Sequence, residues 1–276
     1  MGKIGRLLAN KNFHSEKEAN EFLNKVMNSN EDLSEEKLTP LEEAQDLMYA
    51  AWDSSGKQRS KLAWSALEIS RDCADAYNLL AEEALRSGQF NEAKNLFQQG
   101  LEAGERAIGK DAFIKNAGDF WVITETRPYM RSRHGLANVL WNLGDKNQAI
   151  VHYADMLRLN PNDNQGIRYI LLLCLLEDNR NEEVGDLLKQ FDEAMADWAY
   201  SKALWAFRTK NPKSNDYLKD AIESNQHVPD YLLGKKKLSP RLPEYISPGE
   251  DNEAISYAAA AIKVWKTTQG AIEWLA

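Results

Sequence analysis

The chain has 276 residues with 34 basic and 42 acidic side chains, which give a net charge of −8. Its hydrophobic fraction of 43% is normal for a folded protein, while the acidic balance argues against a general nucleic-acid-binding protein. The N-terminal sequence has no apolar run of signal-peptide length, and the longest apolar run, residues 169–176, is too short to span a bilayer. We therefore expect a soluble cytoplasmic protein that does not enter membranes.

The sequence shows no residue pattern that is typical of catalysis. The four histidines are scattered without metal-ligand spacing, and neither a glycine-rich phosphate loop nor a Ser/His/Asp arrangement is found. Cys73 and Cys174 lie far apart in helical or cap positions, which favours buried, reduced thiols over a disulfide. We therefore predict a protein that is not an enzyme and that holds neither a cofactor nor a metal.

Residues 1–37 are predicted to form a tail and one helix. Ser15 can accept a hydrogen bond at the start of that helix, and Glu18 three residues later completes a capping box. Thr39 and Pro40 then mark the start of a longer helical region, because threonine caps helix N-termini well and proline fits the first helical position.

Two segments of the chain repeat each other. Gly88 and Gly144 both fall at turns between helical patterns, and their positions differ by 56. The same offset separates three further pairs of matched residue class, which are Ala93 and Ala149, Phe97 and Tyr153, and Leu101 and Leu157. An offset of 56 corresponds to one repeat of about 34 residues and a 22-residue insertion at residues 108–129.

Residues 130–164 show two amphipathic helices with small, large and turn residues in a fixed order. The eight positions that carry this order are Leu136, Ala137, Leu140, Gly144, Ala149, Tyr153, Leu157 and Pro161. In residue type and spacing the segment resembles the tetratricopeptide repeat (TPR) family, whose unit is a helix–turn–helix. The resemblance implies an all-α fold, a right-handed superhelical TPR solenoid with about five units over residues 38–226.

A wider resemblance covers two strings of the sequence. Residues 120–164 and the ending at 265–275 are similar to bacterial TPR proteins of unassigned role. Some of those proteins are grouped with the suppressor-of-tumorigenicity family.

Three segments lie outside the regular units. The insertion 108–129 is expected to prolong the preceding helix, to form a short helix around residues 119–124 and to shape a binding surface. A proline-rich loop is predicted at residues 227–249, because its four prolines exclude a long helix. A capping helix is predicted within residues 250–276, where it would cover the last apolar face.

The resemblance also implies a peptide-binding groove on the concave face, lined by the first helix of each unit at positions 2, 5, 9 and 12. The groove residues predicted here are Asn78, Glu82, Arg131, His134, Asn138, Trp141, Gln165, Arg168 and Tyr169. Some family members hold the terminal carboxylates of a peptide in a Lys/Asn/Arg clamp. Asn138 and Arg168 resemble parts of this clamp, but the full lysine-bearing set is absent.

The two groove arginines allow two interpretations. Arg131 and Arg168 could bind an acidic peptide through charge-assisted hydrogen bonds. Alternatively they could pair with acidic side chains of the array itself, for which Glu125, Asp163 and Glu82 are the candidates.

We expect a non-enzymatic scaffold or adaptor whose partner is a protein or peptide, with acidic character as one expectation. The alternative is a helical-repeat regulator or accessory subunit that contacts nucleic acid through the basic loop at residues 235–241, although the acidic surface argues against a nucleic-acid partner. A third hypothesis is an enzyme with a site that the insertion builds over the groove.

Overall fold

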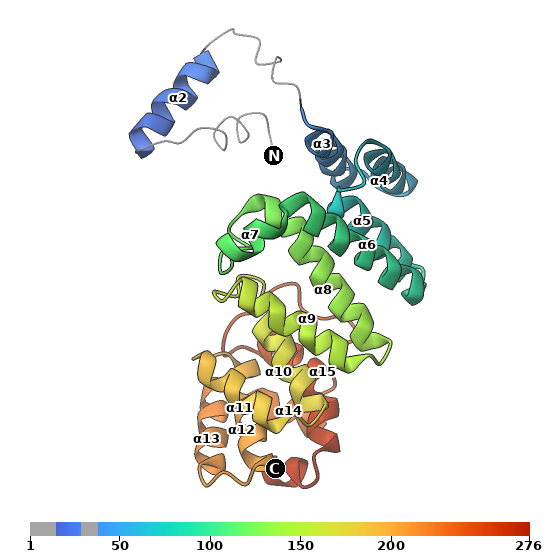
Figure 1. Cartoon of the computed structure of the whole chain (residues 1–276). Coiled ribbons are helices and arrows are strands. Elements are labelled where there is room, and N and C mark those ends of the chain that lie inside the picture. The colour runs from blue at the N-terminus through green and yellow to red at the C-terminus, as the bar shows by residue number, and fades with distance from the viewer. Residues whose placement is uncertain (1–14, 29–37) are drawn as a thin grey trace. The chain divides into compact units, whose positions relative to one another are not determined.

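The computed structural model describes residues 15–28 and 38–276, which form helices joined by turns and short loops (Figure 1). The all-α fold predicted from the sequence is confirmed. Helix α2, Glu16–Asn28, is the helix expected near the N-terminus, and the Ser15 hydroxyl accepts a hydrogen bond from the backbone N–H of Glu18 at 3.2 Å. The predicted tail, residues 1–14, and residues 29–37 lie outside the described residues.

The chain divides into two units, Met1–Val139 and Leu140–Ala276, called unit 1 and unit 2 below. After residue 37, unit 1 contains the first two predicted helix pairs, the insertion and most of the helix that follows it. These elements are α3 (Pro40–Trp52), α4 (Lys57–Ile69), α5 (Ala74–Arg86), α6 (Phe90–Ile108), α7 (Lys110–Lys115), the 3-10 turn η2 (Thr124–Thr126) and α8 (Arg127–Asn142), which continues into unit 2.

The first helix of the array begins where local chemistry predicts it. The Thr39 side chain accepts a hydrogen bond from the backbone N–H of Glu42 at 3.3 Å, and the Glu42 carboxylate accepts one from the backbone N–H of Thr39 at 2.8 Å. Pro40 occupies the first helical position, where its missing N–H leaves no bond unmade. Gly88 takes the predicted turn between α5 and α6 with φ 72°.

Helices α5, α6 and α8 pack closely in unit 1 because glycines lie at their contacts. A Cβ atom added at Gly135 would lie 2.2 Å from Cε1 of Phe97, and one added at Gly104 would lie 2.8 Å from Cβ of Tyr129. Real side chains do not tolerate contacts of this length, so only glycine allows this spacing. The spacing brings the start of α8 against α6, beside the pocket described below.

The insertion follows its predicted path only in part. Helix α6 is prolonged as expected, but the short helix is α7, Lys110–Lys115, and the prediction of a helix around residues 119–124 is wrong. Phe120 is completely buried, with ring centroids 5.0 Å from Phe113 and 6.0 Å from Tyr129. The chain turns here because Phe120 enters this aromatic cluster, and the positive φ of Gly118 permits the turn.

Unit 2 contains the end of α8, the remaining predicted helices and one short helix, Val228–Leu232, that was not predicted. These are α9 (Lys146–Leu159), α10 (Ile167–Glu177), α11 (Asn181–Gln190), α12 (Ala196–Arg208), α13 (Ser214–Ser224), α14 (Val228–Leu232), α15 (Asp251–Thr267) and α16 (Ala271–Leu275). Gly144 takes the turn before α9 with φ 88°, and Asn179 adopts the left-handed conformation after α10 with φ 59°. The loop predicted at residues 227–249 is interrupted, because α14 lies within it and Pro229 occupies an early position of that helix. The remainder, residues 233–249, contains no helix.

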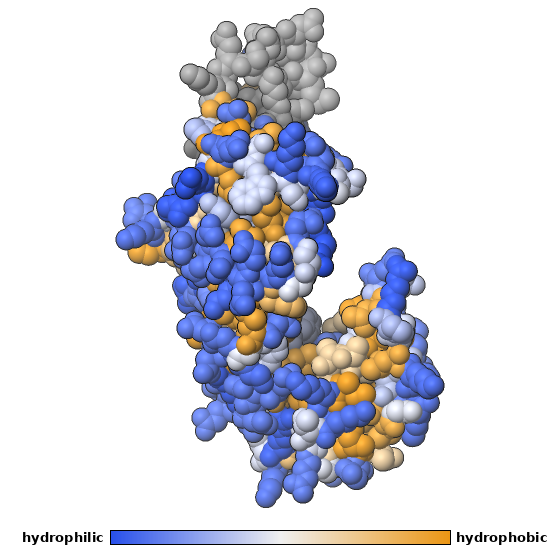
Figure 2. Space-filling model, turned by 90° about the vertical axis from the view of Figure 1, so that its right-hand side faces the viewer, coloured by the Kyte–Doolittle hydropathy of each residue, from blue (hydrophilic) through white to orange (hydrophobic). Residues whose placement is uncertain are grey.

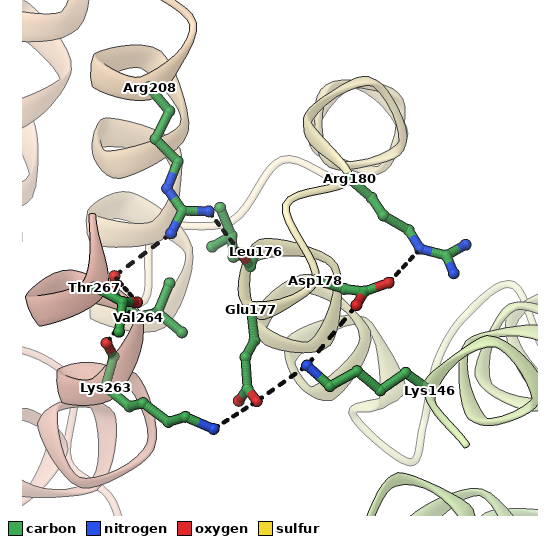
Figure 3. Close-up of polar contacts among 9 residues, drawn as sticks. All are labelled: Lys146, Leu176, Glu177, Asp178, Arg180, Arg208, Lys263, Val264 and Thr267. Carbon is green, nitrogen blue, oxygen red and sulfur yellow. Dashed lines mark hydrogen bonds and ion pairs between the residues drawn. The ribbon is translucent and has the colours of Figure 1, made fainter. Parts of the chain in front are cut away.

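Arg208 connects three helices of unit 2 (Figure 3). It is the last residue of α12, and its guanidinium donates to the Leu176 carbonyl of α10 at 2.5 Å and to the Val264 carbonyl of α15 at 3.4 Å. Its Nε also donates to the Thr268 hydroxyl at 2.8 Å. Burial lowers the pKa of Arg208, and no carboxylate pairs with it among the described residues. The cation instead satisfies carbonyls at two helix C-termini.

A more exposed ion-pair network lies beside this contact (Figure 3). The Glu177 carboxylate lies 2.7 Å from Nζ of Lys263 and 3.4 Å from Nζ of Lys146. These two ammonium groups lower the pKa of Glu177, although partial burial acts in the opposite direction. The network links the end of α10 to α9 and α15.

Asp197 is a half-buried carboxyl group near the start of α12. Burial, and after it the nearby carboxylate of Glu253, together raise its pKa to about 6. Glu253 is itself buried, and it accepts hydrogen bonds from the backbone N–H of Ala196 at 2.9 Å and from the Asn225 amide at 2.8 Å. The folded chain therefore binds a proton at Asp197 more tightly than the unfolded chain does.

The raised pKa predicts that Asp197 makes stability depend on pH. Its contribution is fully present below the unfolded value of 3.8 and is lost as pH rises through about 6. In Asp197→Asn this loss disappears, so relative to wild type the variant gains roughly 1–2 kcal/mol between pH 4 and pH 7. Urea unfolding at several pH values measures the difference. Asp192→Asn, at an exposed position, is the control, and parallel curves for wild type and Asp197→Asn would contradict the prediction.

Hydrophilic residues cover most of the face drawn in Figure 2, and hydrophobic residues are visible between them. Cys73 and Cys174 are free and buried, which confirms the prediction of reduced thiols. Among the helices that the structure describes, none combines the length and apolar character needed to cross a membrane.

Candidate functional site

A pocket of about 320 Å³ opens between the helices of unit 1. Four parts of the sequence contribute to it, namely α3, the start of α5, the end of α6, and the segment from η2 into α8. The lining residues are Leu41, Glu42, Gln45, Asp46, Tyr49, Trp52, Asp72, Ala74, Asp75, Gly104, Ala107, Thr124, Glu125, Arg127, Pro128 and Arg131. Thr124, Glu125, Arg127 and Pro128 belong to the insertion, so the insertion forms part of the pocket lining.

The best-defined polar contact of the pocket is the pair between Asp75 and Arg131. The Arg131 guanidinium donates from Nε to Oδ1 of Asp75 at 2.8 Å and from Nη2 to Oδ2 at 2.6 Å. Gln45 donates to Oδ2 of the same carboxylate at 3.0 Å. Asp75 is only 1% exposed, whereas the Arg131 side chain keeps 37% of its surface exposed. Arg131 thus covers a buried carboxylate and presents its other side to the pocket.

The buried side chain of Asn78 forms hydrogen bonds to Asp75 and to two residues of α8. Its amide donates to Oδ1 of Asp75 at 3.3 Å and to the Pro128 carbonyl at 3.1 Å, while its own oxygen accepts from the Ser132 hydroxyl at 2.7 Å. Asn78 is buried, so it connects α5 to the start of α8 and does not face a ligand directly. The structure therefore brings the predicted residues Asn78 and Arg131 together through Asp75.

Aromatic side chains form one wall of the pocket. The rings of Tyr49 and Trp52 meet edge to face with centroids 5.5 Å apart. The guanidinium carbon of Arg131 lies 5.6 Å from the centre of the Trp52 ring, within the range of a cation–π contact. Across the pocket, Arg127 donates to the Trp121 carbonyl at 2.8 Å and lies over the Trp121 ring. Both arginines are thus held in place within unit 1.

Three further predicted residues belong to unit 1, and the first of them is Glu82. It lies on the exposed surface of α5 and pairs with Arg86 at 3.4 Å, one helical turn away. His134 and Asn138 are half-buried on α8, and burial lowers the pKa of His134. None of these three residues lines the pocket.

In unit 2, the structure brings Arg168 and Tyr169 into one cluster. Arg168 lies 2.9 Å from the buried Asp163 carboxylate and 2.8 Å from the Glu193 carboxylate. Its guanidinium lies 4.5 Å from the centre of the Tyr169 ring, and the Tyr169 hydroxyl donates to Glu193 at 3.1 Å. Asp163 also accepts from the backbone N–H of Ile167 at 2.7 Å, so the cluster caps the start of α10.

The last two predicted groove residues are Trp141 and Gln165. The Trp141 ring stacks under the ammonium of Lys146 at 4.9 Å, and the buried Oε1 of Gln165 has no hydrogen-bond partner in the described structure. Within the described ranges no group of three or more His, Cys, Asp or Glu side chains is placed to hold a metal.

Arg168 pairs with Asp163, which is one of the acidic residues that the second interpretation proposed as partners. For Arg131 the partner is Asp75, which was not among the candidates. A signal for it exists in the sequence, because Asp75 and Arg131 are separated by 56 positions, the offset of the repeats. They therefore occupy the same position of two successive units, and this is where neighbouring first helices meet.

Comparisons with known proteins place the chain in a family. A family model described as "ST7 protein" matches residues 34–276. The "Suppressor of tumorigenicity 7 protein-like" protein of Homo sapiens is 30% identical over 255 residues, covering 83% of this chain and 44% of that protein. The "Protein ST7 homolog" of Drosophila melanogaster is 29% identical over 260 residues, covering 84% of this chain and 48% of that protein. This chain thus spans less than half the length of these relatives.

One solved structure is also similar. It is described as "Crystal structure of YrrB: a TPR protein with an unusual peptide-binding site", and it is 20% identical with a TM-score of 0.47, covering 67% of this chain and 84% of that one. The expected resemblance to bacterial proteins of unassigned role stays a prediction. The match over residues 34–276 and the relatives at 30% identity show that the chain belongs to the ST7 protein family.

Proposed function

We propose that this chain is a non-enzymatic, cytoplasmic helical-repeat scaffold that binds a segment of another protein in the unit 1 pocket. The observation that carries the proposal is the pocket itself, which is lined by the first helices α3, α5 and α8 and by the insertion. The repeat resemblance supports the proposal in part, because it implies a groove lined by first helices, and Arg131 is the one predicted groove residue in the lining of this pocket. The volume of about 320 Å³ suits a few side chains of an extended segment.

The alternative of nucleic-acid binding has less support from the described residues. In the basic loop, Lys236 lies 3.0 Å from the Asp251 carboxylate, and Arg241 pairs with Glu244. Internal carboxylates therefore compensate two of its cations. A phosphate backbone would need several uncompensated cations on one surface.

Blocking the pocket tests the proposal. Ala107 is an exposed residue in the pocket wall, so Ala107→Trp fills the pocket without entering the core. Ala50→Trp is the matched control, because Ala50 is exposed on α3 outside the lining residues. We expect a displayed library of short random peptides to yield binders to wild type and to Ala50→Trp, with their affinity reduced at least about tenfold by Ala107→Trp.

Failure to enrich any peptide would overturn the proposal, and so would equal binding by Ala107→Trp and wild type. The predicted groove arginines are less suited to this test. Replacing Arg131 or Arg168 removes the partner of a buried carboxylate, so lost binding could reflect lost structure.

A further inference from the structure

We propose that the unit 1 pocket selects a basic side chain, lysine or arginine, of the bound segment, so that the partner is a positively charged protein segment. This inference rests on the proposed function, because it names the chemistry of the segment that the scaffold would bind. It differs from the acidic partner expected from the arginines in the sequence. Three observations on the pocket carry it, namely its charge, the contacts of its two arginines, and the apolar and aromatic residues in its lining.

The first observation is the charge of the lining. Five lining residues are acidic, and these are Glu42, Asp46, Asp72, Asp75 and Glu125. Two are basic, Arg127 and Arg131. A cleft lined mainly by one sign of charge focuses its potential and attracts the opposite charge. The pocket therefore favours a cation and repels a carboxylate.

The second observation is that the pocket arginines are committed to the protein. Both oxygens of the buried Asp75 carboxylate accept from Arg131. Arg127 is fixed by the Trp121 carbonyl and the Trp121 ring. An acidic ligand would have to compete with Asp75 for Arg131 and would leave a fully buried carboxylate without its cation, at high cost.

The third observation is the arrangement of apolar and acidic groups. Leu41, Ala74 and Pro128 contribute apolar surface, and Tyr49 and Trp52 form an aromatic wall. Lysine and arginine bury an alkyl stem against apolar surface and keep a charged end near water or a carboxylate. A pocket whose lining combines apolar surface, two aromatic rings and acidic groups fits such a side chain.

Glu125 is the carboxylate best placed to receive this charge. It is exposed at the edge of the pocket in η2, and it makes no ion pair among the described residues. Asp72, in contrast, already pairs with Arg106 at 2.7 Å. The insertion that carries Glu125 would thereby set the charge preference of the pocket.

The test reverses the charge of Glu125 and determines the sequences and affinities of the peptides that bind. Glu125→Lys is compared with Glu92→Lys, which makes the same change of net charge at an exposed position of α6 outside the pocket. Random displayed peptides are selected on wild type, and a selected peptide is then synthesised with each lysine and arginine replaced by glutamine. We expect enrichment of lysine and arginine, and a loss of affinity of roughly tenfold both for the glutamine peptide and for Glu125→Lys.

The outcomes separate the two proposals. The inference is supported if the selected peptides are enriched in lysine and arginine and if their affinity falls for Glu125→Lys but not for Glu92→Lys. Peptides that bind through the pocket, are blocked by Ala107→Trp and show no excess of basic residues would overturn the inference while leaving the scaffold proposal intact. Equal losses for Glu125→Lys and Glu92→Lys would also overturn it, because they would show a general charge effect. If no peptide binds at all, both proposals fail.

Discussion

Replacing Arg131 by methionine is expected to lower the free energy of unfolding by about 3–5 kcal/mol. The variant leaves the Asp75 carboxylate, which is 1% exposed, without the cation that both of its oxygens bind. Asp75→Leu should cost less, because Arg131 is 37% exposed and can turn toward water when the carboxylate is gone. The double variant, with both partners apolar, should recover much of the loss. Urea unfolding of the four proteins, followed by circular dichroism, gives this order.

A nearby surface pair provides the control for the Arg131 prediction. Arg106 and Asp72 pair at 2.7 Å with 51% and 44% of their side-chain surfaces exposed, so Asp72→Asn should cost less than about 1 kcal/mol. If Arg131→Met costs no more than Asp72→Asn, the buried pair does not stabilise unit 1 as described. A loss in the double variant equal to the sum of the single losses would also contradict the account, because contacting residues should not behave additively.

Replacing Arg208 by alanine should lower the free energy of unfolding by about 3 kcal/mol, because the half-buried guanidinium loses its charged hydrogen bonds to the Leu176 and Val264 carbonyls and to the Thr268 hydroxyl. The carbonyls of Leu176 and Val264 lie near the ends of α10 and α15, and after the substitution each would keep only its local donors, such as the backbone N–H groups of Asn179 and Thr268, so the link between the helices would be lost. Arg208→Lys should recover only part of the loss, since one ammonium cannot reproduce the planar guanidinium fork that reaches both helix ends. Thermal and urea unfolding measure the three proteins under identical conditions.

The matched control for Arg208 is Arg158→Ala. Arg158 is exposed on α9, and among the described residues its ion pair is with Asp155, three residues away, at 2.7 Å. Its loss should change stability by less than about 0.5 kcal/mol. If Arg208→Ala and Arg158→Ala lower the free energy of unfolding by similar amounts, the contacts by which Arg208 connects three helices do not stabilise unit 2 as described. If Arg208→Lys is as stable as wild type, the positive charge alone is sufficient.

The repeat architecture could be predicted because its signals are local. A capping threonine followed by proline starts α3 at Pro40, and glycines with positive φ end α5 and α8 at the expected places. Asn179 takes the same left-handed role after α10, although its side chain carries a Cβ atom. Each of these features depends on a few consecutive residues, so one sequence is sufficient to find it.

The pocket and the course of the insertion depend on residues that are distant in the sequence. Asp75 pairs with Arg131 because two first helices pack at one repeat offset, and the choice among many acidic candidates depends on which carboxylate is buried there. The short helix of the insertion was misplaced for a similar reason. Phe120 turns into a cluster with Phe113 and Tyr129, and helical periodicity alone does not reveal that cluster.

The burial of the two cysteines has a practical consequence for spectroscopy. Burial raises the pKa of both the Cys73 and Cys174 thiols to about 12, so neither supplies the exposed thiolate that reacts with maleimides. A cysteine introduced at Ile114, whose side chain is 83% exposed in the insertion, would therefore be labelled selectively. A fluorophore or spin label attached there could follow the insertion while ligands bind, with both natural cysteines left in place.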